Sequence, residues 1–144
     1  VDPIIIDQEA GQAVVLDYLT ASTSGRAIKR FNRKGEDERF HISKMQGPAD
    51  VIQWQVDFQS PGTYEVRIRY AAIPDWEGAS FIVDAGKSRT QGSVKSSEGW
   101  YEYKTEHAGT LDIKRKGVQS IRLYPEKSLD HYLMYFNSME LVPK

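Results

Sequence analysis

Residues 50–71 read DVIQWQVDFQSPGTYEVRIRYA, and this stretch decides the fold. Apolar and polar side chains alternate within residues 50–58 and again within residues 63–71. A period of two is the repeat of a half-buried β-strand, whereas a helix would scatter the same apolar residues around its axis. Residues 60–62, Ser-Pro-Gly, separate the two runs and are typical of a turn. The stretch therefore predicts two strands joined as an antiparallel hairpin.

Short runs of the same kind continue on both sides of this stretch, separated by Gly, Pro, Ser and Asp. No stretch shows a helical apolar stripe longer than about three turns. A chain of 144 residues supports one core, so we expect one domain, residues 1–144, folded as an all-β, two-sheet antiparallel jelly-roll β-sandwich. Further strands are expected at residues 4–6, 13–16, 79–85, 88–94, 100–105, 110–114, 120–125 and 133–142.

Composition excludes several classes of protein. Hydrophobic residues make up 40% and charged residues 27%, which indicates a folded chain. The 19 basic and 20 acidic residues leave a net charge of −1, which argues against a nucleic-acid partner. No apolar run approaches the ~20 residues that cross a bilayer, so membrane insertion is not expected. Cysteine is absent, which excludes disulfides and thiolate chemistry.

Catalytic and metal motifs are weak. The 3 histidines are far apart, and no nucleophile motif accompanies the one in Leu129-Asp130-His131-Tyr132, so we predict no enzyme activity for this chain. A structural calcium ion is the one cofactor considered, held by Glu9 and Glu140 if the first and last strands pair; the alternative is two exposed acids. Residues 22–47 break the alternation, and they predict either a functional loop or a solvated edge hairpin of mixed charge.

Aromatic side chains are the most informative group. Those on the predicted strand faces are expected in the core, namely Trp54, Phe58, Tyr64, Tyr70 and Phe81. Trp76, Trp100 and Tyr132 instead lie in turn contexts beside polar residues, where each is either a lid on the core or a platform for a ligand. An aromatic ring stacks on the CH face of a sugar while adjacent polar groups bond its hydroxyls. This combination favours a shallow sugar site in the loops.

Several segments resemble galactose-binding-like β-sandwich modules. The stretch 60–71 is similar to the PGtYeVrlrYA motif of carbohydrate-binding module families 6 and 35, and of the C-terminal sandwich of bacterial α-L-fucosidases and related exported sulfatases. Residues 78–83, 99–103, 108–117 and 133–143 resemble other strands of these modules.

The resemblance implies a non-catalytic carbohydrate-binding module of a bacterial glycan-degrading system. It implies that the chain was excised from or is appended to a larger exported protein, and that it is secreted, periplasmic or at the cell surface. Its partner would be a glycan or a neighbouring catalytic domain; the alternative is a structural interdomain module without sugar binding. The residues expected to contact the sugar are Trp76, Trp100, Asp75, Asp130, His131 and Tyr132.

Overall fold

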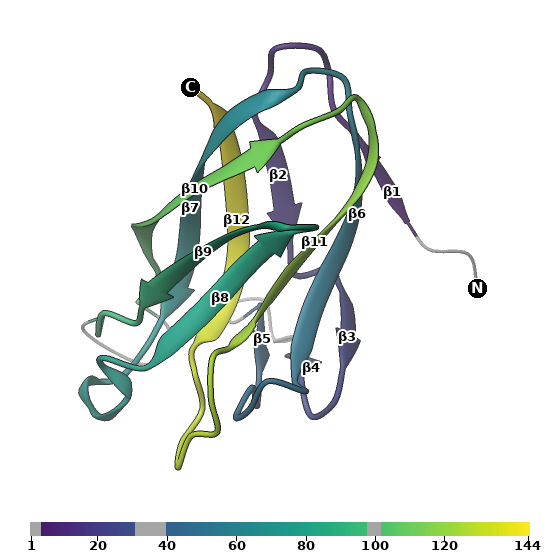
Figure 1. Cartoon of the computed structure of the whole chain (residues 1–144). Coiled ribbons are helices and arrows are strands. Elements are labelled where there is room, and N and C mark those ends of the chain that lie inside the picture. Colours follow the sequence, from purple (N-terminus) through teal and green to yellow (C-terminus); the bar gives the residue numbers. More distant parts are fainter. Residues whose placement is uncertain (1–3, 31–39, 98–101) are drawn as a thin grey trace.

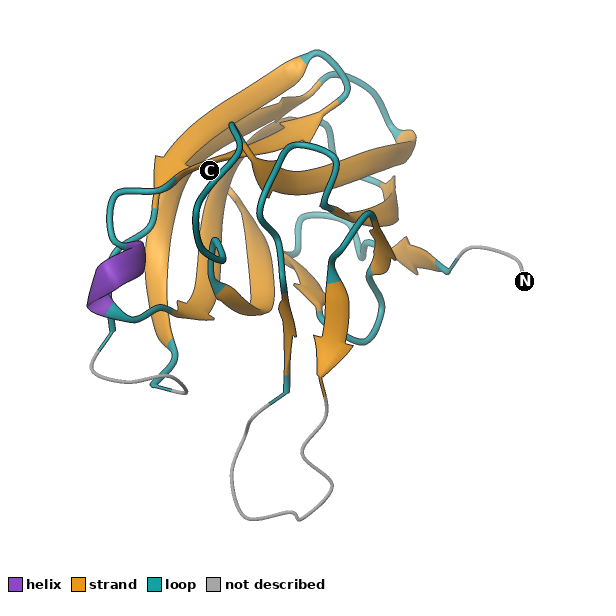
Figure 2. Ribbon diagram, turned by 90° about the horizontal axis from the view of Figure 1, so that it is seen from below, coloured by secondary structure: helices purple, strands orange, loops and turns teal. Residues whose placement is uncertain are grey.

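Two β-sheets packed face to face form the protein, as a computed structural model shows for residues 4–30, 40–97 and 102–144 (Figures 1 and 2). All strand pairs are antiparallel except β1 with β6, which is parallel. The predicted all-β sandwich is therefore confirmed.

The first sheet, sheet A, has the order β1-β6-β11-β8-β9, with β3 also paired to β6. The second, sheet B, has the order β10-β7-β12-β5-β4, with β2 also paired to β12. Sheet A contains β1 (Ile5–Asp7), β3 (Ser22–Ser24), β6 (Val51–Phe58), β8 (Ser80–Ala85), β9 (Ser88–Ser93) and β11 (Gly117–Pro125). Sheet B contains β2 (Val14–Asp17), β4 (Ile28–Arg30), β5 (His41–Ser43), β7 (Gly62–Ala71), β10 (Lys104–Ile113) and β12 (Tyr135–Pro143); a 3-10 helix, η1 (Pro74–Trp76), follows β7.

The predicted hairpin of residues 50–71 is wrong. Both strands exist, but β6 lies in sheet A and β7 in sheet B, so they share no backbone hydrogen bonds. Their apolar stripes face each other across the core, where the rings of Phe58 and Tyr64 stand 5.4 Å apart. The connection between β6 and β7 is thus a crossover between the two sheets. Strands in facing sheets pack their apolar side chains against each other, whereas strands paired within one sheet leave the same face of both uncovered.

Gln8 holds this crossover from the side. Its buried amide Oε1 accepts the backbone N–H of Gln59 at 2.8 Å and of Ser60 at 3.1 Å. Its Nε2 donates to the Tyr64 hydroxyl and to the carbonyl of Gln12, both at 2.8 Å. One buried side chain therefore serves backbone groups of the half-buried turn that have no strand partner.

The structure agrees with the sequence predictions for the core aromatics and for the edge hairpin within residues 22–47. The core aromatics Trp54, Phe58, Tyr64, Tyr70 and Phe81 are all buried. Within residues 22–47 the strands β4 and β5 pair antiparallel at the edge of sheet B, as the edge-hairpin alternative predicted. No helix of the described residues is long and apolar enough to span a bilayer.

We expect Gln8→Ala to lower the free energy of unfolding by about 2–3 kcal/mol, because it leaves buried donors at the crossover unsatisfied. Urea denaturation measures the change. Gln12→Ala is the matched control: only the backbone carbonyl of Gln12 takes part in the contact with Gln8, so stability should stay within about 0.5 kcal/mol. Equal stability of both variants would show that Gln8 does not hold the turn.

Candidate functional site

Three connections meet at one end of the sandwich, here called the loop end. They are residues 44–50 between β5 and β6, residues 72–79 around η1, and residues 126–134 between β11 and β12. Figure 1 shows η1 and the β11–β12 connection at the lower end, and Figure 2 looks onto this end with η1 at its rim. The loop end carries most of the residues predicted to contact a sugar.

A buried carboxylate, Asp50, orders the loop end. It accepts the backbone N–H groups of Arg26, Gln46 and Gly47 at 2.7–3.0 Å, and the Arg26 guanidinium lies 2.8 Å from its Oδ2. Burial alone would raise the pKa of Asp50, but these hydrogen bonds outweigh burial, so the pKa lies below its usual value. A Cβ at Gly25 would come within 2.5 Å of Asp50 Oδ1, which explains the glycine beside it.

The order imposed by Asp50 extends to the β11–β12 connection. The carbonyl of Gln46 accepts the N–H of Leu129 at 2.7 Å, and the carbonyl of Met45 accepts that of Leu133 at 2.8 Å. Leu133 is fully buried and anchors the connection in the core. Residues 130–132, which lie between these two bonds, are therefore held at a defined position on the surface.

Trp76 is a lid on the core. Its side chain is 5% exposed, and its ring packs against Tyr132 at 6.0 Å and Tyr135 at 5.2 Å between centroids. Pro74 begins η1 at a position where its missing N–H costs nothing, and this short turn directs the indole inward. A ring so covered offers little face for stacking a sugar, and the role of Trp76 as a sugar contact stays a prediction.

The predicted polar residues remain accessible. Asp75 and Asp130 are exposed, and neither carboxylate is bonded to another described residue. His131 is half-buried, with Nδ1 2.9 Å from the carbonyl of Tyr132. A carbonyl only accepts, so Nδ1 carries the proton, and Nε2 of the neutral ring is an acceptor. Tyr132 itself is half-buried, and Trp100 lies outside the described residues.

The sequence did not predict that these rings continue onto the outer face of sheet B. Tyr135 stacks on His41 at 4.1 Å, and the Nδ1 of His41 lies 3.3 Å from the Tyr103 hydroxyl. The Arg69 guanidinium lies 5.3 Å from the centre of the Tyr103 ring. The period-two pattern alone would have placed Tyr135 outward, opposite the buried Phe136, but no local pattern brings His41 and Tyr103 beside it.

The proposed calcium pair is not brought together by strand pairing. β1 lies in sheet A, so the pairing of first and last strands on which the calcium pair depended does not occur; β2 pairs with β12 instead. Glu140 on β12 stands opposite Arg67 of β7, while Glu9 is exposed after β1. In the part of the chain that the structure describes, no group of three or more His, Asp or Glu residues is placed to hold a metal. Calcium binding stays a prediction.

The sequence matches no protein-family model and no curated protein significantly. The fold is similar to a family 35 carbohydrate-binding module from Clostridium thermocellum, with a TM-score of 0.73 and 15% identity over 90% of this chain and 98% of that one. It is similar to the C-terminal family 6 module of a laminarinase from Zobellia galactanivorans, with a TM-score of 0.70 and 17% identity over 90% and 98%.

A family 6 module of a Cellvibrio mixtus lichenase, solved with cellotriose, has a TM-score of 0.67 at 13% identity and covers 91% of this chain and 97% of that one. The predicted resemblance to family 6 and family 35 modules is thus confirmed at the level of the fold. The resemblance to fucosidase and sulfatase sandwiches stays a prediction.

We expect low pH to reduce the stability of the loop end. The pKa of Asp50 is lowered on folding, so its contribution to stability is complete above the unfolded value near ~4 and is lost as the pH falls through the folded value. We expect Asp50→Asn to reduce the free energy of unfolding at pH 7 by about 2–4 kcal/mol and to remove this part of the acid dependence. Urea denaturation between pH 7 and pH 3 measures both, with exposed Asp130→Asn as control. An acid profile that Asp50→Asn leaves unchanged would contradict the assignment.

Proposed function

We propose that this chain binds a carbohydrate at the loop end and performs no catalysis itself. The observation that carries the proposal is a fold shared with family 35 and family 6 carbohydrate-binding modules over about nine-tenths of the chain. Open polar groups gathered around a half-buried tyrosine at one end of that fold support it. An exported bacterial glycan-degrading protein is the proposed context.

Tyr132 is the proposed stacking surface. Its ring leans on Trp76, which rests in turn against Tyr135, so the tyrosine cannot easily rotate away from a ligand. A ring fixed before binding loses little conformational entropy when a sugar face lies against it. The buried Trp76 would thus serve binding indirectly, as the support of the half-buried Tyr132 ring.

Asp75, Asp130 and His131 are the proposed hydrogen-bonding groups. The carboxylate oxygens accept hydrogen bonds from sugar hydroxyl groups, and Nε2 of His131 is a further acceptor when Nδ1 carries the ring proton. The fixed positions of Asp130 and His131, between the bonds from Leu129 and Leu133, preset the spacing of the acceptors. Sugar hydroxyls are already well solvated in water, so binding at one shallow site is expected to be weak.

Nothing observed favours the structural interdomain alternative. It would need a contiguous apolar face for a neighbouring domain. Among the described residues, the large exposed apolar side chains come from both sheets, including Ile5 on β1, Val15 on β2 and Val118 on β11. The sugar-binding proposal is therefore the one we test.

Tyr132→Ala should weaken glycan binding about tenfold or more, because it removes both the stacking surface and its contact with Trp76. Affinity electrophoresis through gels containing neutral β-glucan, xylan, mannan or galactan identifies a ligand, and isothermal titration measures the Kd. Tyr132→Phe keeps the ring and should bind nearly as wild type. Lys127→Ala, an exposed change in the same connection, is the matched control.

Asp130→Asn tests the hydrogen bonds separately. It keeps the shape of the side chain and removes its charge, so we expect affinity to fall about fivefold or more without loss of thermal stability. Retention of wild-type affinity by both Tyr132→Ala and Asp130→Asn would place the sugar elsewhere. No binding to any of the glycans would remove the proposal.

A further inference from the structure

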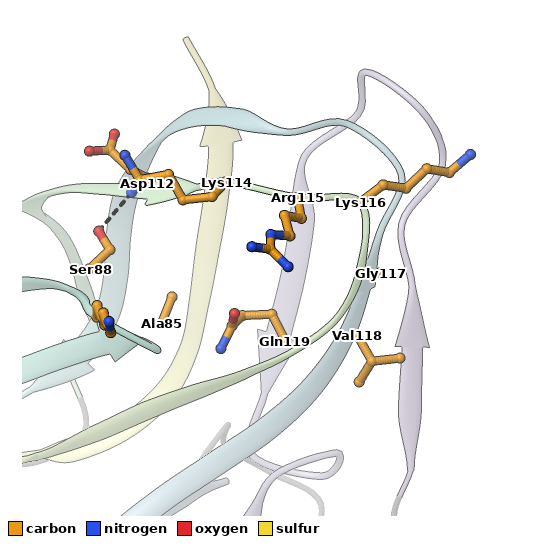
Figure 3. Close-up of a pocket in the computed structure, with 10 residues that line it drawn as sticks. Ala85, Ser88, Asp112, Lys114, Arg115, Lys116, Gly117, Val118 and Gln119 are labelled. Atoms are coloured by element: carbon orange, nitrogen blue, oxygen red, sulfur yellow. Dashed lines mark hydrogen bonds between the residues drawn. The ribbon is translucent and has the colours of Figure 1, made fainter.

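A hollow lies at the opposite end of the sandwich from the loop end. It has a volume of about 690 Å³ and is formed where the β8–β9 turn approaches the β10–β11 crossover (Figure 3). β11 begins at this hollow and ends at the loop end, and its nine residues span roughly 25–30 Å. The hollow is lined by Ala85, Lys87, Ser88, Asp112, Lys114, Arg115, Lys116, Gly117, Val118 and Gln119.

The rim of the hollow is built from fixed backbone. The N–H of Asp112 donates to the Ser88 hydroxyl at 2.8 Å, which ties the start of β9 to the end of β10. At the β8–β9 turn Gly86 has a φ of +64°, and a Cβ there would lie 3.3 Å from the Gln119 amide. Glycine therefore permits both the turn and the close approach of Gln119, so the two sides keep a constant separation.

Positive charge dominates the lining. Four of the lining residues are cations and one is a carboxylate, in a chain whose net charge is −1. The cations make no ion pair or hydrogen bond with any other described residue. The carboxylate is occupied: Asp112 Oδ1 accepts the Thr63 hydroxyl at 3.0 Å, and Figure 3 shows the group pointing away from the hollow.

Arg115 is the central cation. Figure 3 shows its side chain extending from the β10–β11 turn over the hollow toward Gln119, while Lys116 points away. Lys87 lies on the facing β8–β9 turn, so Arg115 and Lys87 come from the two sides of the hollow, whereas Figure 3 shows the Lys114 side chain extending away from Arg115 toward Asp112. A guanidinium binds a planar or tetrahedral oxyanion through two parallel N–H groups, and a flanking ammonium adds a point charge.

We propose that this hollow is a second binding site, which accepts the anionic substituent, a sulfate ester or a carboxylate, of a charged polysaccharide. Arg115 would hold the oxyanion, with Lys87 on the facing turn; the Gln119 amide, whose Nε2 donates to the Ser120 carbonyl at 3.2 Å, has a second N–H to offer. Ala85 and the exposed Val118 supply an apolar wall for the carbon face of the sugar that carries the charge. That the anion belongs to a glycan rests on the function proposed above.

A phosphate backbone fits less well. A nucleic acid needs a long basic stripe that follows many phosphates, whereas these cations are confined to one hollow on a chain with slightly more acidic than basic residues. One charged substituent on an otherwise uncharged sugar needs only the local cluster. Contacts between exposed charges are screened by salt, so binding is expected to weaken with added salt.

The experiment compares matched polysaccharides on the intact chain. A sulfated galactan, the same galactan after desulfation, and a polygalacturonate are titrated by isothermal calorimetry at low and at near-physiological salt. We expect the sulfated or the uronate polymer to bind more tightly than the desulfated one at low salt. Double-stranded DNA of similar charge content is titrated in the same way to test whether any polyanion binds.

Arg115→Ala/Lys87→Ala should reduce binding of the charged polymer about tenfold or more, because each charge-assisted hydrogen bond is stronger than a neutral one. Arg115→Lys retains the charge and should recover part of the affinity. Lys104→Ala/Lys127→Ala is the matched control, since it removes two exposed charges outside the hollow and should change affinity less than twofold.

The two sites fail independently. If Tyr132→Ala abolishes neutral-glycan binding and leaves charged-polymer binding unchanged, both proposals stand. Equal loss in the Arg115→Ala/Lys87→Ala variant and its charge-matched control would overturn the second site, as would equal affinity for the DNA or for the desulfated galactan. If neither the wild type nor any variant binds a neutral glycan, while the charged polymer binds as predicted, only the function proposed for the loop end is refuted.

Discussion

The structure depends on two apolar stripes that face each other across a gap instead of lying side by side. β6 and β7 follow one another in the sequence, yet each belongs to a different sheet, and their contact at Phe58 and Tyr64 closes the core. A chain that changes layers must pass its backbone through a region with no strand partner. Gln8 supplies the missing hydrogen bonds there, so a polar side chain from the first loop is as necessary to this core as the apolar residues themselves.

This arrangement shows how far alternation in a sequence can be interpreted. A period of two identified the strands and the inward face of each one, because both follow from local geometry. It did not identify the neighbours of a strand, since the same stripe is buried equally well in a hairpin within a layer and in an arch between layers. A short Pro-Gly turn suits both connections, and Gln8 lies about fifty residues away in the sequence.

The same limit applies to the candidate site, where the sequence indicated the residue types but not their neighbours in space. The sequence placed aromatic and polar residues in the turns, and the structure brings Asp75, Trp76 and residues 130–132 to one end. It could not tell a lid from a platform, because Trp76 differs from an exposed indole only in what packs over it. Nor could it identify Asp50, whose three backbone donors come from two separate loops and are not encoded by side-chain type. Carboxylates that bind backbone groups leave no pattern in the sequence.

The strand β11 runs from the positively charged hollow at one end of the sandwich to the ordered loop end at the other. At the loop end a buried carboxylate fixes a connection whose polar groups face solvent. At the far end a crossover and a tight turn present exposed cations that are not paired with any other described residue. A single sugar cannot reach both ends of a strand roughly 25–30 Å long. A polysaccharide that carries both kinds of sugar can, and its second contact would then form at high effective concentration, so two weak sites on one small sandwich would hold such a polymer more tightly than either site does alone.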